Sequence, residues 1–315
     1  MSNMKTPRAA SKIYIYGIIM ASVLVWALSF PFIKIGLDHV SPFMLGMLRS
    51  VISAVVIGVV AFILYGPAMF RRSPRDWLLL FALGLTAVAI PNVLQNIGMQ
   101  YTSASIASII QCSGPVFTIV MAALFLKERL TPIKTIGIIL AMTGVFFILT
   151  GGRFDFSGSG FYGNLLQLIT AFSYSISGIL GKMTLNSQKY EPLELVALYV
   201  MTGGLMLALS TPFFAISEIA SLGAVSLSGW GAILFLSLLP SALAYVWWYK
   251  ALDTMEISRL TFFVYLIPVE STIISHFWLG DEITWFTVLF GFVTVAGVAI
   301  AQWQKPAALK KRPVT

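Results

Sequence analysis

The chain has 315 residues, of which 58% are hydrophobic and 10% are charged, and its formal net charge is +8. Soluble domains carry about 25% charged residues, so this composition excludes an ordinary water-soluble globular protein. A basic balance in a soluble protein would suggest nucleic acid, but here the distribution of charge among loops matters more than its total, and no nucleic-acid partner is expected.

Uninterrupted apolar runs follow one another along the chain. A bilayer core about 30 Å thick requires roughly 20 apolar residues in each crossing helix. Ten runs of about this length lie at residues 13–33, 42–65, 77–100, 103–126, 131–150, 161–184, 192–216, 228–251, 258–279 and 283–302. The connections are short, which predicts an all-α polytopic membrane protein with ten transmembrane helices and no soluble domain.

The first run follows a basic start that contains Lys5 and Arg8. A secretion signal has an apolar region of about 7–15 residues, and this run is longer, so we expect it to be retained as the first helix. If both termini are cytoplasmic, most Lys and Arg fall in the inside segments and the outside loops hold only Lys34 and Arg153. The positive-inside rule therefore predicts a cell (inner) membrane protein with both termini in the cytoplasm.

Several chemistries lack their sequence requirements. Cys112 is the only cysteine, which excludes an internal disulfide and a cysteine-based metal cluster. Residues 181–183 (Gly-Lys-Met) lack the earlier glycine and the Ser/Thr of a phosphate loop. His39 and His276 lie near the predicted outer surface, where no catalytic Ser/His/Asp set can be assembled. We therefore expect no catalytic residue, no cofactor and no metal, and no enzyme activity.

The chain repeats itself. Residues 127–149 align with 280–302 at an offset of 153, and the same offset pairs Pro115 with Pro268. For the first helix of each half the offset is 148, which pairs Trp26 with Tyr174 and Ser29 with Ser177. The predicted halves are residues 1–150 (helices 1–5) and 151–315 (helices 6–10 with a basic tail).

Each half has five crossings, so the second copy must enter the membrane upside down. Inverted repeats can exchange conformations around a central site, which opens that site first to one side and then to the other. This predicts a transporter that works by alternating access. A passive scaffold built by duplication is the alternative reading of the repeat.

Two stretches resemble a known family. WALSFPFIKIGLDHVSPFMLGMLRSVISAVVI (26–57) resembles the opening of an EamA repeat, and GPVFTIVMAALFLKERLTPIKTIGIILAMTGV (114–145) is similar to its close. The resemblance to the EamA-type drug/metabolite transporter superfamily covers essentially the whole chain. In overall character the chain is most similar to the YddG-type exporters of aromatic and other hydrophobic amino acids. This resemblance implies export of such substrates.

The charged positions depart from the repeat pattern. Arg49 matches the family's second-helix Arg, whereas Tyr199 stands at that place in the second copy, and Asp281-Glu282 replaces Glu128-Arg129. Arg49 can snorkel, bond backbone carbonyls or attract a carboxylate. Glu270 lies roughly 200° around its helix from Pro268, so we expect it to face another helix rather than a cavity.

Polar residues inside membrane helices cost free energy and tend to face a cavity or one another. In the third predicted helix Asn92 and Gln95 share one face, and the repeat superposes Tyr245 and Trp248 on them. The predicted cavity residues are Trp26, Ser29, Asn92, Gln95, Gln111, Tyr174, Ser177, Tyr245, Trp248 and Tyr265. The alternative is that these groups bond neighbouring helices, at about 1 kcal/mol or less per bond.

Pro115 and Pro268 each lack a backbone donor, and as a matched pair they are predicted hinges; static kinks are the alternative. A neutral cavity lined by rings and amides suits a substrate with an apolar body and a small polar head.

The sequence thus predicts a secondary transporter exporting small amphipathic metabolites, aromatic and other hydrophobic amino acids first. Its expected partners are that small molecule and the lipid bilayer. The oligomeric state is left open, with a monomer as one possibility. Another substrate class of the same superfamily, a multipass membrane enzyme and a receptor are the alternatives.

Overall fold

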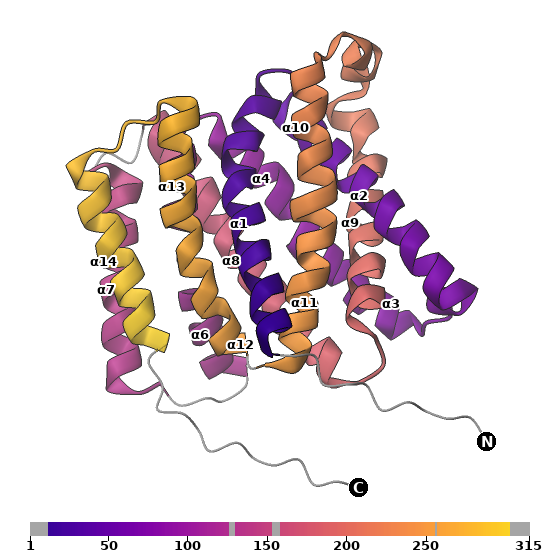
Figure 1. The fold of residues 1–315 in the computed structure, drawn as a ribbon, viewed down its shortest axis with the longest axis horizontal. Helices are drawn as coiled ribbons and strands as arrows, with labels where there is room; N and C mark the ends of the chain where they lie inside the picture. Colours follow the sequence, from indigo (N-terminus) through magenta and orange to yellow (C-terminus); the bar gives the residue numbers. More distant parts are fainter. Residues whose placement is uncertain (1–11, 126–129, 153–157, 256, 303–315) are drawn as a thin grey trace, which may run out of the picture.

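The computed structural model describes residues 12–125, 130–152, 158–255 and 257–302. Within these ranges every regular element is helical and none is a strand (Figure 1). The predicted turn residues Glu128 and Arg129, and Arg153 of an outer loop, lie outside the described residues.

The elements follow one another with short connections. The first half contains α1 (Lys12–Leu37), α2 (Pro42–Tyr65), η1 (Gly66–Phe70), α3 (Pro74–Gly84), η2 (Leu85–Ala89), α4 (Ile90–Met99), α5 (Ala104–Gln111), α6 (Gly114–Phe125) and α7 (Pro132–Thr150). The second half contains α8 (Ser159–Asn186), α9 (Pro192–Phe214), η3 (Ile216–Ala224), α10 (Leu227–Leu238), η4 (Leu239–Leu243), α11 (Ala244–Thr254), α12 (Ile257–Leu260), η5 (Thr261–Tyr265), α13 (Leu266–Leu279) and α14 (Trp285–Gln302).

Local sequence explains where many helices begin. Ser41, Ser73 and Thr131 each accept a hydrogen bond from a backbone N–H of the first turn, and each is followed directly by proline. Such a cap satisfies an unpaired donor, and proline at the first helical position loses no bond. α2 and α7 therefore begin within one residue of their predicted starts, and α3 begins three residues before its own.

In the part of the chain that the structure describes, eight helical segments are long and apolar enough to cross a membrane, judged by length and composition. Two shorter apolar segments, Phe263–Leu279 and Trp285–Ala301, fall at the ninth and tenth predicted positions. The protein is therefore an all-helical multi-span membrane protein. The segment Phe263–Leu279 takes in the end of η5 and all of α13.

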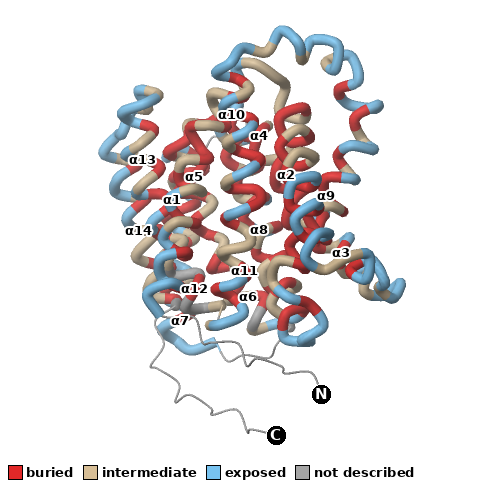
Figure 2. The backbone as a smooth tube through the Cα atoms, turned by 45° about the vertical axis from the view of Figure 1, so that its right-hand side comes forward, coloured by how far each residue is buried: buried red, intermediate tan, exposed pale blue. Residues whose placement is uncertain are grey.

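The helices form one bundle with α7 and α14 side by side at one edge and α2, α3 and α9 toward the other (Figure 1). Exposed residues lie mainly on the outer helices, and buried ones line the inside of the bundle (Figure 2). Large apolar side chains such as Ile63, Phe213 and Phe292 are exposed on the outside. A surface of this kind is stable only in contact with lipid.

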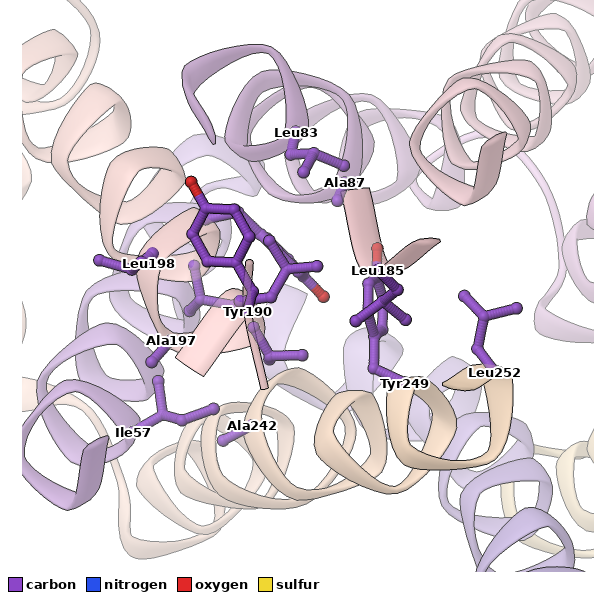
Figure 3. Close-up of a cluster of buried hydrophobic side chains, with 14 of the residues drawn as sticks. Ile57, Leu83, Ala87, Leu185, Tyr190, Ala197, Leu198, Ala242, Tyr249 and Leu252 are labelled. Atoms are coloured by element: carbon purple, nitrogen blue, oxygen red, sulfur yellow. The ribbon is translucent and has the colours of Figure 1, made fainter. Parts of the chain in front are cut away.

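The largest core cluster joins the two halves. Figure 3 shows part of it, with Leu83 on one helix and Ala242, Tyr249 and Leu252 on another. Tyr199 is fully buried in the same cluster. The start of α1 and the end of α14 lie at the same end of the bundle (Figure 1), as an even number of crossings requires.

The fourth predicted helix, 103–126, is two helices. The chain turns at Cys112 and Ser113 between α5 and α6, and Pro115 is the second residue of α6. Proline is accommodated there because the first-turn N–H groups of a helix have no helical partner. Pro268 is likewise in the first turn of α13, directly after η5. Both prolines therefore follow a local departure from α-helical hydrogen bonding, which is the effect that proline has on the preceding turn.

Candidate functional site

A cavity of about 190 Å³ lies in the middle of the bundle, between the two halves. Eight of the ten predicted cavity residues line it, together with Pro115 and Arg49. The eight are Trp26, Ser29, Gln95, Gln111, Tyr174, Ser177, Tyr245 and Trp248. Both halves of the chain therefore contribute to a single space of the size of a small molecule.

Aromatic rings make one wall. The Trp26 ring lies 4.9 Å from that of Trp248 and 5.9 Å from that of Tyr245, measured between centroids, both in edge-to-face orientation. Trp26 Nε1 donates to the carbonyl oxygen of Pro240 at 3.2 Å, and the Tyr245 hydroxyl donates to that of Ala87 at 3.1 Å. Because backbone carbonyls satisfy these polar atoms, the rings offer apolar surface to a ligand.

The carbonyls that accept these bonds come from two π-helical segments, η2 and η4. Pro91 lacks an N–H, so the carbonyl of Ala87 four residues earlier lacks its usual α-helical donor and accepts from Tyr245. In η4 the N–H of Ala244 bonds the carbonyl of Leu239, five residues back, which leaves the carbonyl of Pro240 available to Trp26. The periodicity of the sequence gave no signal for either segment.

Amides make another part of the lining, through Gln95 and Gln111. Gln111 Nε2 donates to Gln167 Oε1 at 2.6 Å, and Gln167 Nε2 donates to the carbonyl of Gln95 at 3.0 Å. Gln167 was missed in the sequence, although it lies seven residues before Tyr174 and therefore on the same face of α8. Gln167 is fully buried and connects α8 to α4 and α5. Tyr249, four residues after Tyr245, was missed as well and lines the cavity.

Arg49 carries charge into this neutral surface. Its side chain is 4% exposed, and its Nε donates to Ser241 Oγ of η4 at 3.1 Å. Its Nη1 is buried and has no hydrogen-bond partner among the described residues. Of the five N–H groups of the guanidinium, Ser241 therefore takes one.

Four predicted residues lie outside the cavity lining. Asn92 is 2% exposed and its Nδ2 donates to Ser50 Oγ at 2.8 Å, which joins α4 to α2. Tyr265 packs in a core cluster with Val116 and Val298. Pro268 and Glu270, on α13, are likewise absent from the lining. For Asn92 and Tyr265 this placement favours the alternative in which the side chain packs or bonds helices.

The composition of the lining limits its chemistry. Among the described residues no group of three His, Cys, Asp or Glu is close enough to hold a metal ion. The lining offers rings, amides, hydroxyls and one guanidinium. Such groups can bind and orient a small amphipathic molecule.

A family model described as the EamA-like transporter family matches residues 13–150 and again 161–302. The chain belongs to the EamA-like transporter family. An uncharacterized transporter of Archaeoglobus fulgidus is 31% identical to this EamA-like protein over 279 residues, which cover 88% of this chain and 93% of that one.

A second relative is named by what it exports. A probable terminal-alkyne amino-acid exporter of Streptantibioticus cattleyicolor is 28% identical over 284 residues, covering 90% of this chain and 91% of its own. One solved crystal structure has a TM-score of 0.67 at 20% identity and covers 92% of this chain and 97% of its own, a likeness of fold.

Proposed function

We propose that this chain is a secondary transporter that exports small amphipathic metabolites, aromatic and other hydrophobic amino acids first among them, by alternating access. The observation that carries the proposal is the central cavity, to which both halves contribute rings and neutral polar groups. Polar groups deep in a membrane protein cost free energy, so those that face a cavity often mark a path or a binding site. In a member of a transporter family such a cavity is the natural place for the transported molecule.

Paired contacts support an inverted repeat. Lys34 Nζ donates to the carbonyl of Met99 at the end of α4, and Lys182 Nζ donates to that of Leu252 near the end of α11, at 2.6 Å. The two lysines are equivalent under the offset of 148, and the two acceptors under that of 153. α1 ends at the upper end of the bundle in Figure 1, whereas α8 ends at the lower one. The same lysine-to-carbonyl contact is therefore found at both ends of the bundle, which is the arrangement expected of two inverted copies.

In this proposal all ten apolar segments cross the membrane, including the two shorter ones, and both termini are cytoplasmic. The double match of the family model, to residues 13–150 and 161–302, supports two repeats. Ion pairs at the end that carries the termini tie the halves together. Arg72 pairs with Glu194, and Lys189 pairs with Asp76 at 3.2 Å.

The substrate class rests on two supports. The ring wall formed by Trp26, Tyr245 and Trp248 suits an apolar or aromatic side chain, and the amides of the lining suit a small polar head. One relative is named an amino-acid exporter. Hydrophobic amino acids have both an apolar side chain and a small polar head, and their size suits a cavity of about 190 Å³.

Flux of labelled amino acids into liposomes that contain the pure protein tests the proposal, with and without a pH gradient. We expect uptake of phenylalanine and leucine well above that of empty liposomes and of liposomes with a Trp248→Ala variant. The pH gradient reports whether protons are coupled. An absence of flux for every amino acid and related metabolite would contradict the proposal and favour a receptor or an enzyme.

A further inference from the structure

Arg49 is the only charged side chain among the described residues that line the central cavity. The lining holds no aspartate or glutamate among those residues, so the guanidinium has no counterion there. A buried charge without a counterion costs several kcal/mol. An anion supplied from outside the chain would remove this cost.

The guanidinium is held by one neutral group, the hydroxyl of Ser241. Its Nε is bonded to Ser241 Oγ, and this leaves the Nη atoms, of which Nη1 is buried without a partner among the described residues. A guanidinium has a planar fork of donors that matches the two oxygens of a carboxylate. Ser241 lies one turn before Tyr245, so the charge is next to the ring wall. The free donors and the apolar surface therefore belong to one binding space.

The charge count selects the kind of anion. One guanidinium with no second cation in the described lining can neutralise one negative charge, and a phosphate dianion would keep the other. A positive ammonium group, by contrast, finds only carbonyls, amides, hydroxyls and ring faces. The cavity therefore matches a monocarboxylate with an apolar body, and an amino group on that body has no ion-pair partner in the described lining.

We propose that Arg49 binds the carboxylate of the transported metabolite, and that the site recognises this carboxylate and not the amino group. The inference rests on the proposed function, since it takes the ligand of the cavity to be the cargo. It extends the substrate class from hydrophobic amino acids to apolar monocarboxylates without an amino group. It also predicts that the corresponding amines, which lack a carboxylate, are not substrates.

Binding to the purified full-length protein in detergent tests this with four probes that share one ring. These are L-phenylalanine, 3-phenylpropionate, its methyl ester and 2-phenylethylamine, measured by isothermal titration and by thermal shift. We expect the two carboxylates to bind with affinities within ten-fold of each other, and the ester and the amine to bind at least ten-fold more weakly. An amine or ester that binds the wild-type protein as tightly as the acids would overturn the assignment, whatever any variant does.

Variants give a second, independent result. Arg49→Gln is expected to lose at least ten-fold in affinity for 3-phenylpropionate and to lose the preference over its ester, whereas Arg49→Lys keeps part of both. Arg75→Gln removes an exposed arginine and is the matched control, with unchanged affinity. A folded Arg49→Gln protein whose carboxylate affinity stays within two-fold of the wild type would contradict the role of Arg49.

Failure of this inference is distinguishable from failure of the proposed function. Flux of phenylethylamine that Trp248→Ala abolishes would overturn the carboxylate assignment and leave the transporter proposal standing. Carboxylate binding that depends on Arg49, without flux of any probe, would sustain the assignment and contradict transport.

Discussion

At the scale of single residues, the ring wall has the largest expected effect on binding. Trp248 contacts Trp26 with ring centroids 4.9 Å apart and lines the cavity. Truncation to alanine removes apolar contact worth about 1.5–3 kcal/mol for a buried side chain. We therefore expect Trp248→Ala to weaken the apparent affinity for phenylalanine by ten-fold or more, measured by titration of the purified protein.

Trp285→Ala is the matched control, because Trp285 is 79% exposed at the start of α14. The affinity of the Trp285→Ala variant for phenylalanine should equal that of the wild type. If Trp248→Ala stays within two-fold of wild-type affinity and only its melting temperature falls, the ring serves packing and the site lies elsewhere.

Asn92 is expected to behave in the opposite way. Its side chain is 2% exposed and donates to Ser50 Oγ at 2.8 Å, outside the cavity lining. Asn92→Leu removes a buried bond, which costs about 1–3 kcal/mol of folding stability. We expect a lower melting temperature in detergent with unchanged ligand affinity. A change in selectivity among amino acids at wild-type stability would restore Asn92 to the site.

The contrast between Asn92 and Gln95 shows what periodicity can predict. Residues three apart share a face only approximately, since they differ by about 60° around a helix. Gln95 reaches the cavity, whereas Asn92 turns toward α2. Trp26 and Tyr174, which the repeat pairs, both line the cavity, whereas of the pair Asn92 and Tyr245 only Tyr245 does. Helix packing decides whether a polar side chain meets the cavity or a neighbouring helix, and a single sequence does not reveal that packing.

At the scale of elements, close approach of backbones joins α7 to α14. A Cβ atom added at Gly137 would lie 2.2 Å from the backbone nitrogen of Ala301, and one added at Gly297 would lie 2.2 Å from that of Ala141. Small residues permit such packing in membranes, where lipid gives no hydrophobic drive between helices. Gly137→Ala should therefore push the helices apart and cost about 1–3 kcal/mol.

The same substitution elsewhere provides the comparison. Gly231, in α10, has nothing within 4 Å of an added Cβ. Gly231→Ala should be neutral or stabilising, because alanine has the higher helix propensity by about 1 kcal/mol. Thermal unfolding of both variants in the same detergent measures the difference. Equal melting temperatures of the Gly137→Ala and Gly231→Ala variants would contradict the close backbone approach of α7 and α14.

The elements also show where sequence reasoning stops. The apolar runs predicted the starts of α2, α3 and α7 to within three residues, and a Ser-Pro or Thr-Pro pair stands at each of them. The π-helical segments η2 and η4 were not predicted, since a one-residue shift in hydrogen bonding leaves the apolar pattern nearly intact. These segments nonetheless supply the carbonyls that hold Tyr245 and Trp26.

At the scale of the whole molecule, the orientation in the membrane follows from the distribution of charge. Cysteine in place of Ser221, which is exposed in η3, should react with an impermeant maleimide on intact cells. Cysteine in place of Ala68, exposed in η1, should react only after permeabilisation. The parent chain is the control, because its single cysteine, Cys112, is 1% exposed. Reversed labelling would place both termini outside.

Exchange across the membrane tests the central claim most directly. In a carrier with one central site, the site turns back to the outer side faster when unlabelled substrate occupies it on the inner side. A channel or a receptor shows no such acceleration. Liposomes containing the protein are loaded with unlabelled phenylalanine and diluted into a trace of labelled phenylalanine. We predict transient accumulation of label above its equilibrium level, lost in Trp248→Ala. Label that only equilibrates, at the same rate with or without internal phenylalanine, would contradict alternating access through this cavity.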